Sequence, residues 1–226
     1  MKKRILSILL LCCMVLTLLP TTVLAADGPM DTIPKYDVSI DVYNRTSDIS
    51  IKDSRSYYIY SSVPDKLRDT WAWDKKIFIK GDKTAPHVFI DGVNIEMSPS
   101  SKGPAIELNK KASAYIYFIG KNSSLQGADG RAAIQKNRSE GQLYVLARTG
   151  TTVTCKGGDK AAGIGGSYAT RNIFNGYYNG DMYGHGVNMH FGSRSNPDYW
   201  GGIIAAIGGN GGAGIGGGKE GSGDVT

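Results

Sequence analysis

Aromatic and amide side chains are concentrated in one stretch of this sequence, residues 167–200. Tyr177, Tyr178, Tyr183 and Trp200 supply aromatic rings, and Asn179 lies among them. Flat rings stack on the faces of sugars while amides bond to sugar hydroxyls, and a mixture of Tyr, Asn and Gly is typical of adaptable binding surfaces. The stretch therefore predicts a carbohydrate-binding surface. The alternative is that these rings pack against the structure beneath them.

Trp71 and Trp73 are a second pair of candidate ligand-binding residues. They lie two positions apart in the segment Thr-Trp-Ala-Trp-Asp, and alternate residues of an extended segment point to the same side. The two rings form either a binding platform or part of the packing in the first turns of the fold.

Acid–base chemistry has one candidate grouping, Asp181, His185 and Asp198, close to the aromatic stretch. Glycoside hydrolysis uses two carboxylates that face the scissile bond, and polysaccharide lyases combine clustered acids with a base. These three residues are widely spaced, so we interpret them as solvated loop residues and expect a non-catalytic protein. His185 and His190 do not by themselves form a metal site, and no metal is predicted.

Two glycine motifs suggest cofactors, and each lacks an essential feature. Residues 209–214 match G-x-G-x-x-G, but a dinucleotide site needs a helix after that turn, and the sequence predicts none. Residues 208–216 resemble a calcium-binding nonapeptide, but Ala213 occupies the position of the aspartate, and calcium prefers several hard oxygen ligands. No cofactor is therefore predicted, with calcium kept as an alternative.

The elements that must position these residues are short strands. Runs of three to six β-branched and aromatic residues, such as 38–43, 77–80 and 115–119, are separated by Gly, Asn, Asp and Ser. This pattern is typical of strands joined by turns. Because no convincing amphipathic helix accompanies them, the sequence predicts an all-β fold.

A repeat specifies the fold more closely. Residues 156–166 align with 207–217 without gaps, at an offset of 51 and with seven of eleven positions identical. Aligned isoleucines recur with steps of 28, 30 and 51, so the period is near 30 with an insertion of about 20 residues around 167–187; they are Ile106, Ile134, Ile164 and Ile215. Such a period indicates a solenoid. We predict a right-handed parallel β-helix in which each isoleucine stacks on the next and the flanking glycines allow positive φ at a corner.

The N-terminus predicts export. Three basic residues precede an apolar run over 5–19, and small residues follow, so a signal peptide is expected with cleavage after Ala25. Removing it leaves 23 basic residues of the original 26 against 20 acidic ones. This balance does not favour nucleic-acid binding. Cys155 is then the one remaining cysteine, expected to be a small buried hydrophobe, and no second apolar stretch is long enough to span a membrane.

The strand and glycine patterns together resemble a known family. The matching segments are 77–81, 88–95, 105–108, 119–125, 132–135, 162–166 and 213–217. They resemble exported parallel β-helix proteins of Gram-positive bacteria, described as carbohydrate-binding-domain-like or glycine-rich surface repeat proteins. The resemblance spans roughly residues 48–226 and implies a secreted or surface β-helix that binds sugars.

The resulting organisation has three parts: a signal peptide at 1–25, a lead-in strand region at 26–47, and the β-helix at 48–226. The aromatic-rich insertion lies near 167–200, and a truncated C-terminus is expected because residues 221–226 look like the start of another strand. We expect a monomeric, adhesin-like protein that is secreted or at the cell surface and binds a polysaccharide or cell-surface glycan. The alternatives are a β-helix polysaccharide lyase or glycoside hydrolase, and a structural spacer fragment of a larger surface protein.

Overall fold

A computed structural model describes most of the chain from residue 34 onward. The described residues are 34–101, 103–108, 111–136, 140–168, 173–174, 177–178, 185–192, 199–219 and 223–225. The predicted signal peptide, the start of the lead-in and part of the aromatic-rich insertion lie outside them.

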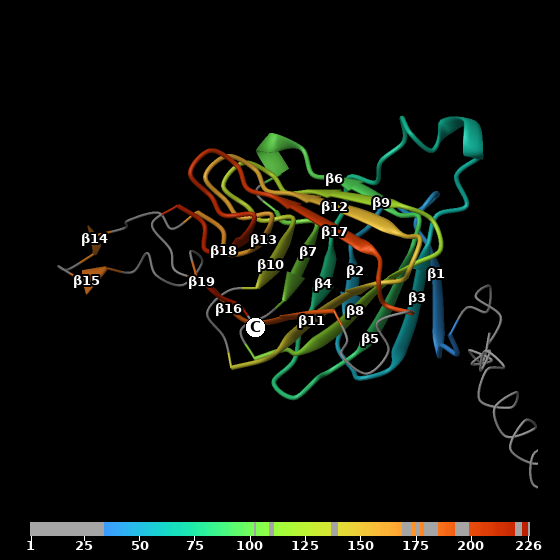
Figure 1. Ribbon diagram of the computed structural model, residues 1–226, viewed down its shortest axis with the longest axis horizontal. Coiled ribbons are helices and arrows are strands. Elements are labelled where there is room, and N and C mark those ends of the chain that lie inside the picture. The colour runs from blue at the N-terminus through green and yellow to red at the C-terminus, as the bar shows by residue number, and fades with distance from the viewer. Residues whose placement is uncertain are drawn as a thin grey trace, which may run out of the picture. The chain divides into compact units, whose positions relative to one another are not determined.

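Three sheets of parallel strands form the fold (Figure 1). Sheet A contains, in spatial order, β1 (Val38–Asp41), β3 (Ser56–Tyr60), β5 (His87–Asp91), β8 (Ala114–Ile119), β11 (Leu143–Ala147), β16 (Gly186–Phe191) and β19 (Gly223–Val225). Sheet B contains β2 (Ile49–Ile51), β4 (Ile77–Ile79), β7 (Ile106–Leu108), β10 (Ile134–Lys136), β13 (Ile164–Gly165) and β18 (Ile215–Gly216). Sheet C contains β6 (Asn94–Glu96), β9 (Ser123–Gln126), β12 (Thr152–Lys156) and β17 (Ile203–Ile207).

The chain passes from sheet A to sheet C to sheet B and then returns to sheet A one strand further along. Four turns contribute a strand to each sheet: β5–β6–β7, β8–β9–β10, β11–β12–β13 and β16–β17–β18. This arrangement is a parallel β-helix, and it confirms the predicted all-β solenoid. Helical structure in the described residues is limited to two 3₁₀ turns, η1 (Asp65–Leu67) and η2 (Pro99–Ser101), and no helix there is long and apolar enough to cross a membrane.

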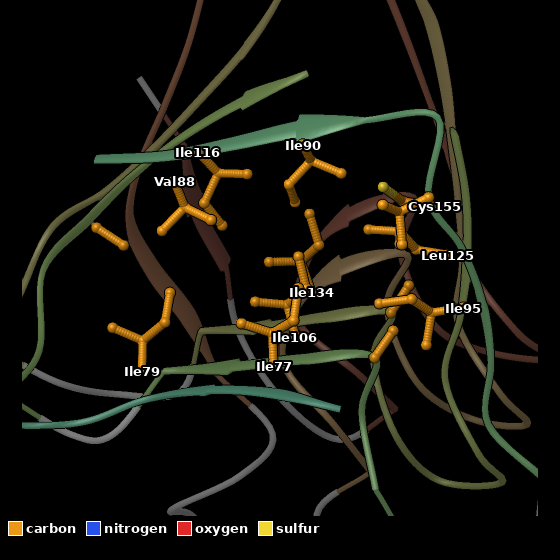
Figure 2. Packing of buried hydrophobic residues seen from close by; sticks show 14 of the residues in the cluster. Ile77, Ile79, Val88, Ile90, Ile95, Ile106, Ile116, Leu125, Ile134 and Cys155 are labelled. Atoms are coloured by element: carbon orange, nitrogen blue, oxygen red, sulfur yellow. The ribbon is translucent and has the colours of Figure 1, made fainter. Parts of the chain in front are cut away.

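Isoleucines stack along the interior of sheet B. Ile106, Ile134, Ile164 and Ile215 are register partners in consecutive strands, which confirms the predicted stacking. The stack also extends to two earlier strands, because Ile49 pairs with Ile77 and Ile77 with Ile106. We call these six residues the interior ladder. Figure 2 shows its central members facing residues from the other two sheets, among them Ile95, Leu125 and Cys155.

Cys155 belongs to this core, as predicted. It is fully buried in β12, where it pairs in register with Leu125 of the preceding turn. Burial raises the pKa of its thiol well above the usual range, because the apolar interior does not solvate a thiolate. The side chain therefore acts as a small apolar residue in the interior.

The long step between Ile164 and Ile215 arises from two longer connections. From Ile134 in β10 to Leu143 in β11 the chain advances nine residues. Between their register partners in the next turn, Ile164 in β13 and Met189 in β16, it advances 25. From Leu143 in β11 to Val153 in β12 the chain advances ten residues, and between their register partners, Met189 in β16 and Ile204 in β17, it advances 15. Most of the added length therefore lies between β13 and β16, where the insertion was expected, and the remainder precedes β17.

Glycines in the two repeated blocks allow the backbones of successive turns to approach closely. Gly165 and Gly216 have φ of 126° and 129°, which confirms the expected positive φ beside the stacked isoleucines. Gly158 lies so close to the turn beneath that a Cβ atom there would overlap the carbonyl of Ala128, and Gly209 stands in the same relation to Gly158. The repeated Gly-Gly pairs are therefore required by the stacking distance itself.

Candidate functional site

A groove of about 590 Å³ lies over the outer face of sheet C. Its floor carries the hydroxyls of Ser124, Thr152 and Thr154 together with the amide of Asn94. A smaller pocket of about 130 Å³ adjoins it and shares three of its lining residues, Asp69, Asn94 and Ser124. We call the two hollows together the sheet-C groove.

Strand alternation explains why the floor is polar. Asn94, Ser124 and Thr154 are register partners in β6, β9 and β12 and face outward. Their chain neighbours Ile95 and Leu125 are also register partners, and these face the core. Because alternate residues of a strand point to opposite faces, three consecutive turns present a row of polar groups beneath the groove.

Residues 68–71 form a wall of the sheet-C groove, because Arg68 and Asp69 line the larger hollow and residues 69–71 line the smaller one. The η1 turn precedes this wall and follows Pro64, whose fixed φ of −56° suits the beginning of a helical turn. The Asn94 side chain donates a hydrogen bond through Nδ2 to the carbonyl of Arg68 over 2.9 Å, which ties the wall to β6. Further along, the backbone N–H of Trp73 donates to the carbonyl of Asn94 over 2.8 Å and returns the chain to sheet C.

Two asparagines also lock neighbouring turns together at the floor. Oδ1 of Asn94 accepts a hydrogen bond from the Ser124 N–H over 3.0 Å, and Oδ1 of Asn122 accepts one from the Thr152 N–H over 2.8 Å. Each bond joins residues 30 positions apart, which is one turn of the solenoid. The amides are therefore held in fixed orientations before any ligand binds, which lowers the entropy lost on binding.

Charged groups of both signs border the sheet-C groove. Arg68 and Lys121 line it, and both contact the carboxylate of Asp65, at 2.8 Å from Arg68 Nη2 and 3.3 Å from Lys121 Nζ. Asp69 also lines the groove, and Glu96 lines the adjoining pocket. Nε of Arg68 is buried and has no hydrogen-bond partner among the described residues. Among the residues that the structure describes, no group of three His, Cys, Asp or Glu side chains lies close enough to hold a metal ion.

The predicted tryptophan pair divides between the groove and the core. Trp71 is half-buried, lines the smaller pocket and meets Tyr43 edge-on, with ring centroids 5.5 Å apart. Trp73 is only 3% exposed, and its Nε1 donates to the Arg45 carbonyl over 2.8 Å. Trp73 belongs to the core cluster and offers almost no surface to a ligand, whereas Trp71 packs against that cluster and stays partly exposed in the pocket.

Trp200 lies on a different face, among aromatic residues outside sheet A. It packs on Tyr117 with ring centroids 5.1 Å apart and a tilt of 40°, and it meets Tyr199 edge-on. Beside this cluster, four rings stack along the solenoid with centroid spacings of 4.7, 4.5 and 4.6 Å. We call these four the aromatic ladder: His87, Tyr115, Tyr144 and His190.

The sequence interpretation missed this ladder, although its signal is present. His87, Tyr115 and Tyr144 recur at steps of 28 and 29, close to the predicted period. The stacked rings are nearly parallel, with interplanar angles of 5° to 18°, so each inner ring uses both faces on its neighbours. Stacking on a sugar requires a free ring face, and this ladder therefore presents mainly ring edges and hydroxyls to solvent.

The predicted residues of the insertion are only partly within the described chain. Tyr177 and Tyr178 form β15 (Tyr177–Tyr178), which pairs antiparallel with β14 (Ile173–Phe174). His185 is half-buried and directly precedes β16. The remaining candidates lie outside the described residues: Asn179, Asp181, Tyr183 and Asp198. The binding and acid–base roles of this group stay predictions.

No family model, curated protein or solved structure matches the chain. The resemblance to exported β-helix proteins of Gram-positive bacteria therefore stays an expectation from the sequence, and the geometry of the groove carries the functional argument.

Proposed function

We propose that this protein is an exported, non-catalytic β-helix protein that binds carbohydrate in the sheet-C groove. The observation that carries the proposal is the row of hydroxyl and amide groups along the groove floor, with Trp71 in the adjoining pocket. Sugars carry many hydroxyls, each of which both donates and accepts hydrogen bonds, and Ser, Thr and Asn side chains offer the same two roles.

The location follows from the N-terminal sequence. A basic start, an apolar run over residues 5–19 and small residues before position 26 favour export. An exported protein with a sugar-binding groove acts at the cell surface or in the medium, where polysaccharides and surface glycans are its available partners. This supports an adhesin-like role.

Binding to a glycan array, followed by calorimetric titration of the strongest ligand, tests this function. The informative variant combines Ser124→Ala with Thr154→Val and removes two hydroxyls from the groove floor. We expect its dissociation constant to rise about fivefold to a hundredfold, because each net hydrogen bond contributes about 0.5–1.5 kcal/mol. Ser50→Ala, an exposed outward serine of β2 in sheet B, is the matched control and should bind like the parent.

Two outcomes would reject this assignment. Failure of the parent protein to bind any glycan would reject carbohydrate binding. Binding that survives the groove variant but is lost in Tyr177→Ala plus Tyr178→Ala would move the site from the groove to the insertion.

A further inference from the structure

The ligand of the sheet-C groove can be specified further by the register of the strands and by the charges around it. We infer that it is a linear, uncharged polysaccharide that lies across the strands, parallel to the solenoid axis, over three turns. This inference rests on the proposed carbohydrate-binding function.

The direction follows from which residues form the floor. Asn94, Ser124 and Thr154 belong to three different strands and are aligned in register. Adjacent strands are about 4.8 Å apart, so polar groups repeat at that spacing along the solenoid axis. A ligand lying along one strand would meet the polar groups of one turn, whereas a chain of sugars lying across the strands meets all three.

The length of the site is limited by β17. The register partner of Thr154 in β17 is Ala205, and the partners of Thr152 and Lys156 are Ile203 and Ile207. These two isoleucines are 62% and 48% exposed, so the outer face of sheet C changes from polar to apolar after β12. The polar row therefore covers two strand spacings, about 10 Å, between β6 and β12.

The charges around the groove favour an uncharged ligand. The cations Arg68 and Lys121 share the carboxylate of Asp65, and Asp69 adds a negative charge to the groove wall. An acidic sugar would have to compete with Asp65 for both cations while facing Asp69, and Glu96 adds a further negative charge in the adjoining pocket. A cationic sugar would be repelled by Arg68 and Lys121. A neutral sugar neither competes with Asp65 for the cations nor faces a charge of its own sign.

Calorimetric titration with neutral oligosaccharides tests the inference. The probes are the cello-, laminari- and malto-oligosaccharides from monomer to hexamer, with polygalacturonate oligomers as the charged comparison. We expect one neutral series to bind, with affinity rising to about the trimer or tetramer and then levelling off. We also expect its dissociation constant to change less than about twofold when salt shortens the Debye length from about 30 Å to 8 Å.

One substitution tests the direction of binding. Ala205→Thr places a hydroxyl on β17, beside Thr154 of β12, and extends the polar row by one strand. We expect the hexamer to bind about twofold to tenfold more tightly, as one added hydrogen bond allows, with the dimer unchanged. An unchanged or weaker hexamer affinity would overturn the axial direction.

The remaining outcomes separate this inference from the proposed function. Binding of polygalacturonate alone, with an affinity that falls steeply with salt, would overturn the neutral class and leave carbohydrate binding intact. A monomer that binds as tightly as the hexamer would overturn the extended site. If neither these probes nor the glycan array gives binding, the proposed function itself is wrong.

Discussion

Replacing Ile134 by alanine tests the interior ladder at its centre. Ile134 is fully buried and pairs in register with Ile106 on one side and Ile164 on the other. The substitution removes three carbon atoms from a space that both neighbours border, and stacked strands do not collapse freely into it. Isoleucine-to-alanine changes in packed cores cost about 2–5 kcal/mol, so we expect the free energy of unfolding to fall by about that amount.

Urea unfolding followed by circular dichroism measures this loss, with Ile203→Ala as the matched control. Ile203 undergoes the same chemical change in a strand of the same solenoid, but it is 62% exposed. Its loss should stay below about 1 kcal/mol, which is the range of strand propensity alone. Equal losses at the two sites, or a loss below about 1 kcal/mol at Ile134, would refute the packing of the ladder.

Three further predictions concern the corners, a buried charge and export. Gly158→Ala should lower the unfolding midpoint more than Gly103→Ala in the same urea assay, because an added Cβ overlaps the Ala128 carbonyl at the first site and meets only the flexible side-chain ends of Met97 and Lys76 at the second. Burial lowers the pKa of Lys136 from 10.5 to about 8, so the unfolded chain binds more protons between these values and stability should rise with pH across that window. Lys136→Met should flatten this rise in unfolding curves measured from pH 8 to 10.5. N-terminal sequencing of the secreted chain should begin at residue 26, and a secreted product that retains the leader would contradict the predicted cleavage.

The interior could be predicted because its chemistry repeats. A solenoid core needs an apolar residue at the same corner in every turn, so Ile106, Ile134, Ile164 and Ile215 recur with their neighbouring small residues. The repeat is less visible at the earlier members of the ladder because their flanking residues differ. Ile77 follows Lys76, whereas each of the later copies follows an alanine or a glycine, although the strand of Ile77 pairs in register with that of Ile106.

The candidate site was less visible because its parts are ordinary and far apart. Asn94, Ser124 and Thr154 are spaced 30 residues apart and resemble any polar residue of an exposed strand. The strand register aligns them, and residues 68–71 border the groove in which they lie. The local enrichment in aromatic residues favoured the insertion instead, because a run of rings close together in the chain is visible in the sequence, whereas residues one turn apart are not adjacent in it.

Register also explains how one solenoid carries unlike outer faces on sheets A and C. The core fixes every second residue of a strand, and the residues between them are free to differ from sheet to sheet. On sheet C the outward residues form a polar row that ends at Ile203 and Ile207, and on sheet A they form the aromatic ladder. Function in such a fold therefore depends on which outward residues are register partners in successive turns. The sheet-C residues that share a register, Asn94, Ser124 and Thr154, place hydroxyl and amide groups in a groove that faces solvent.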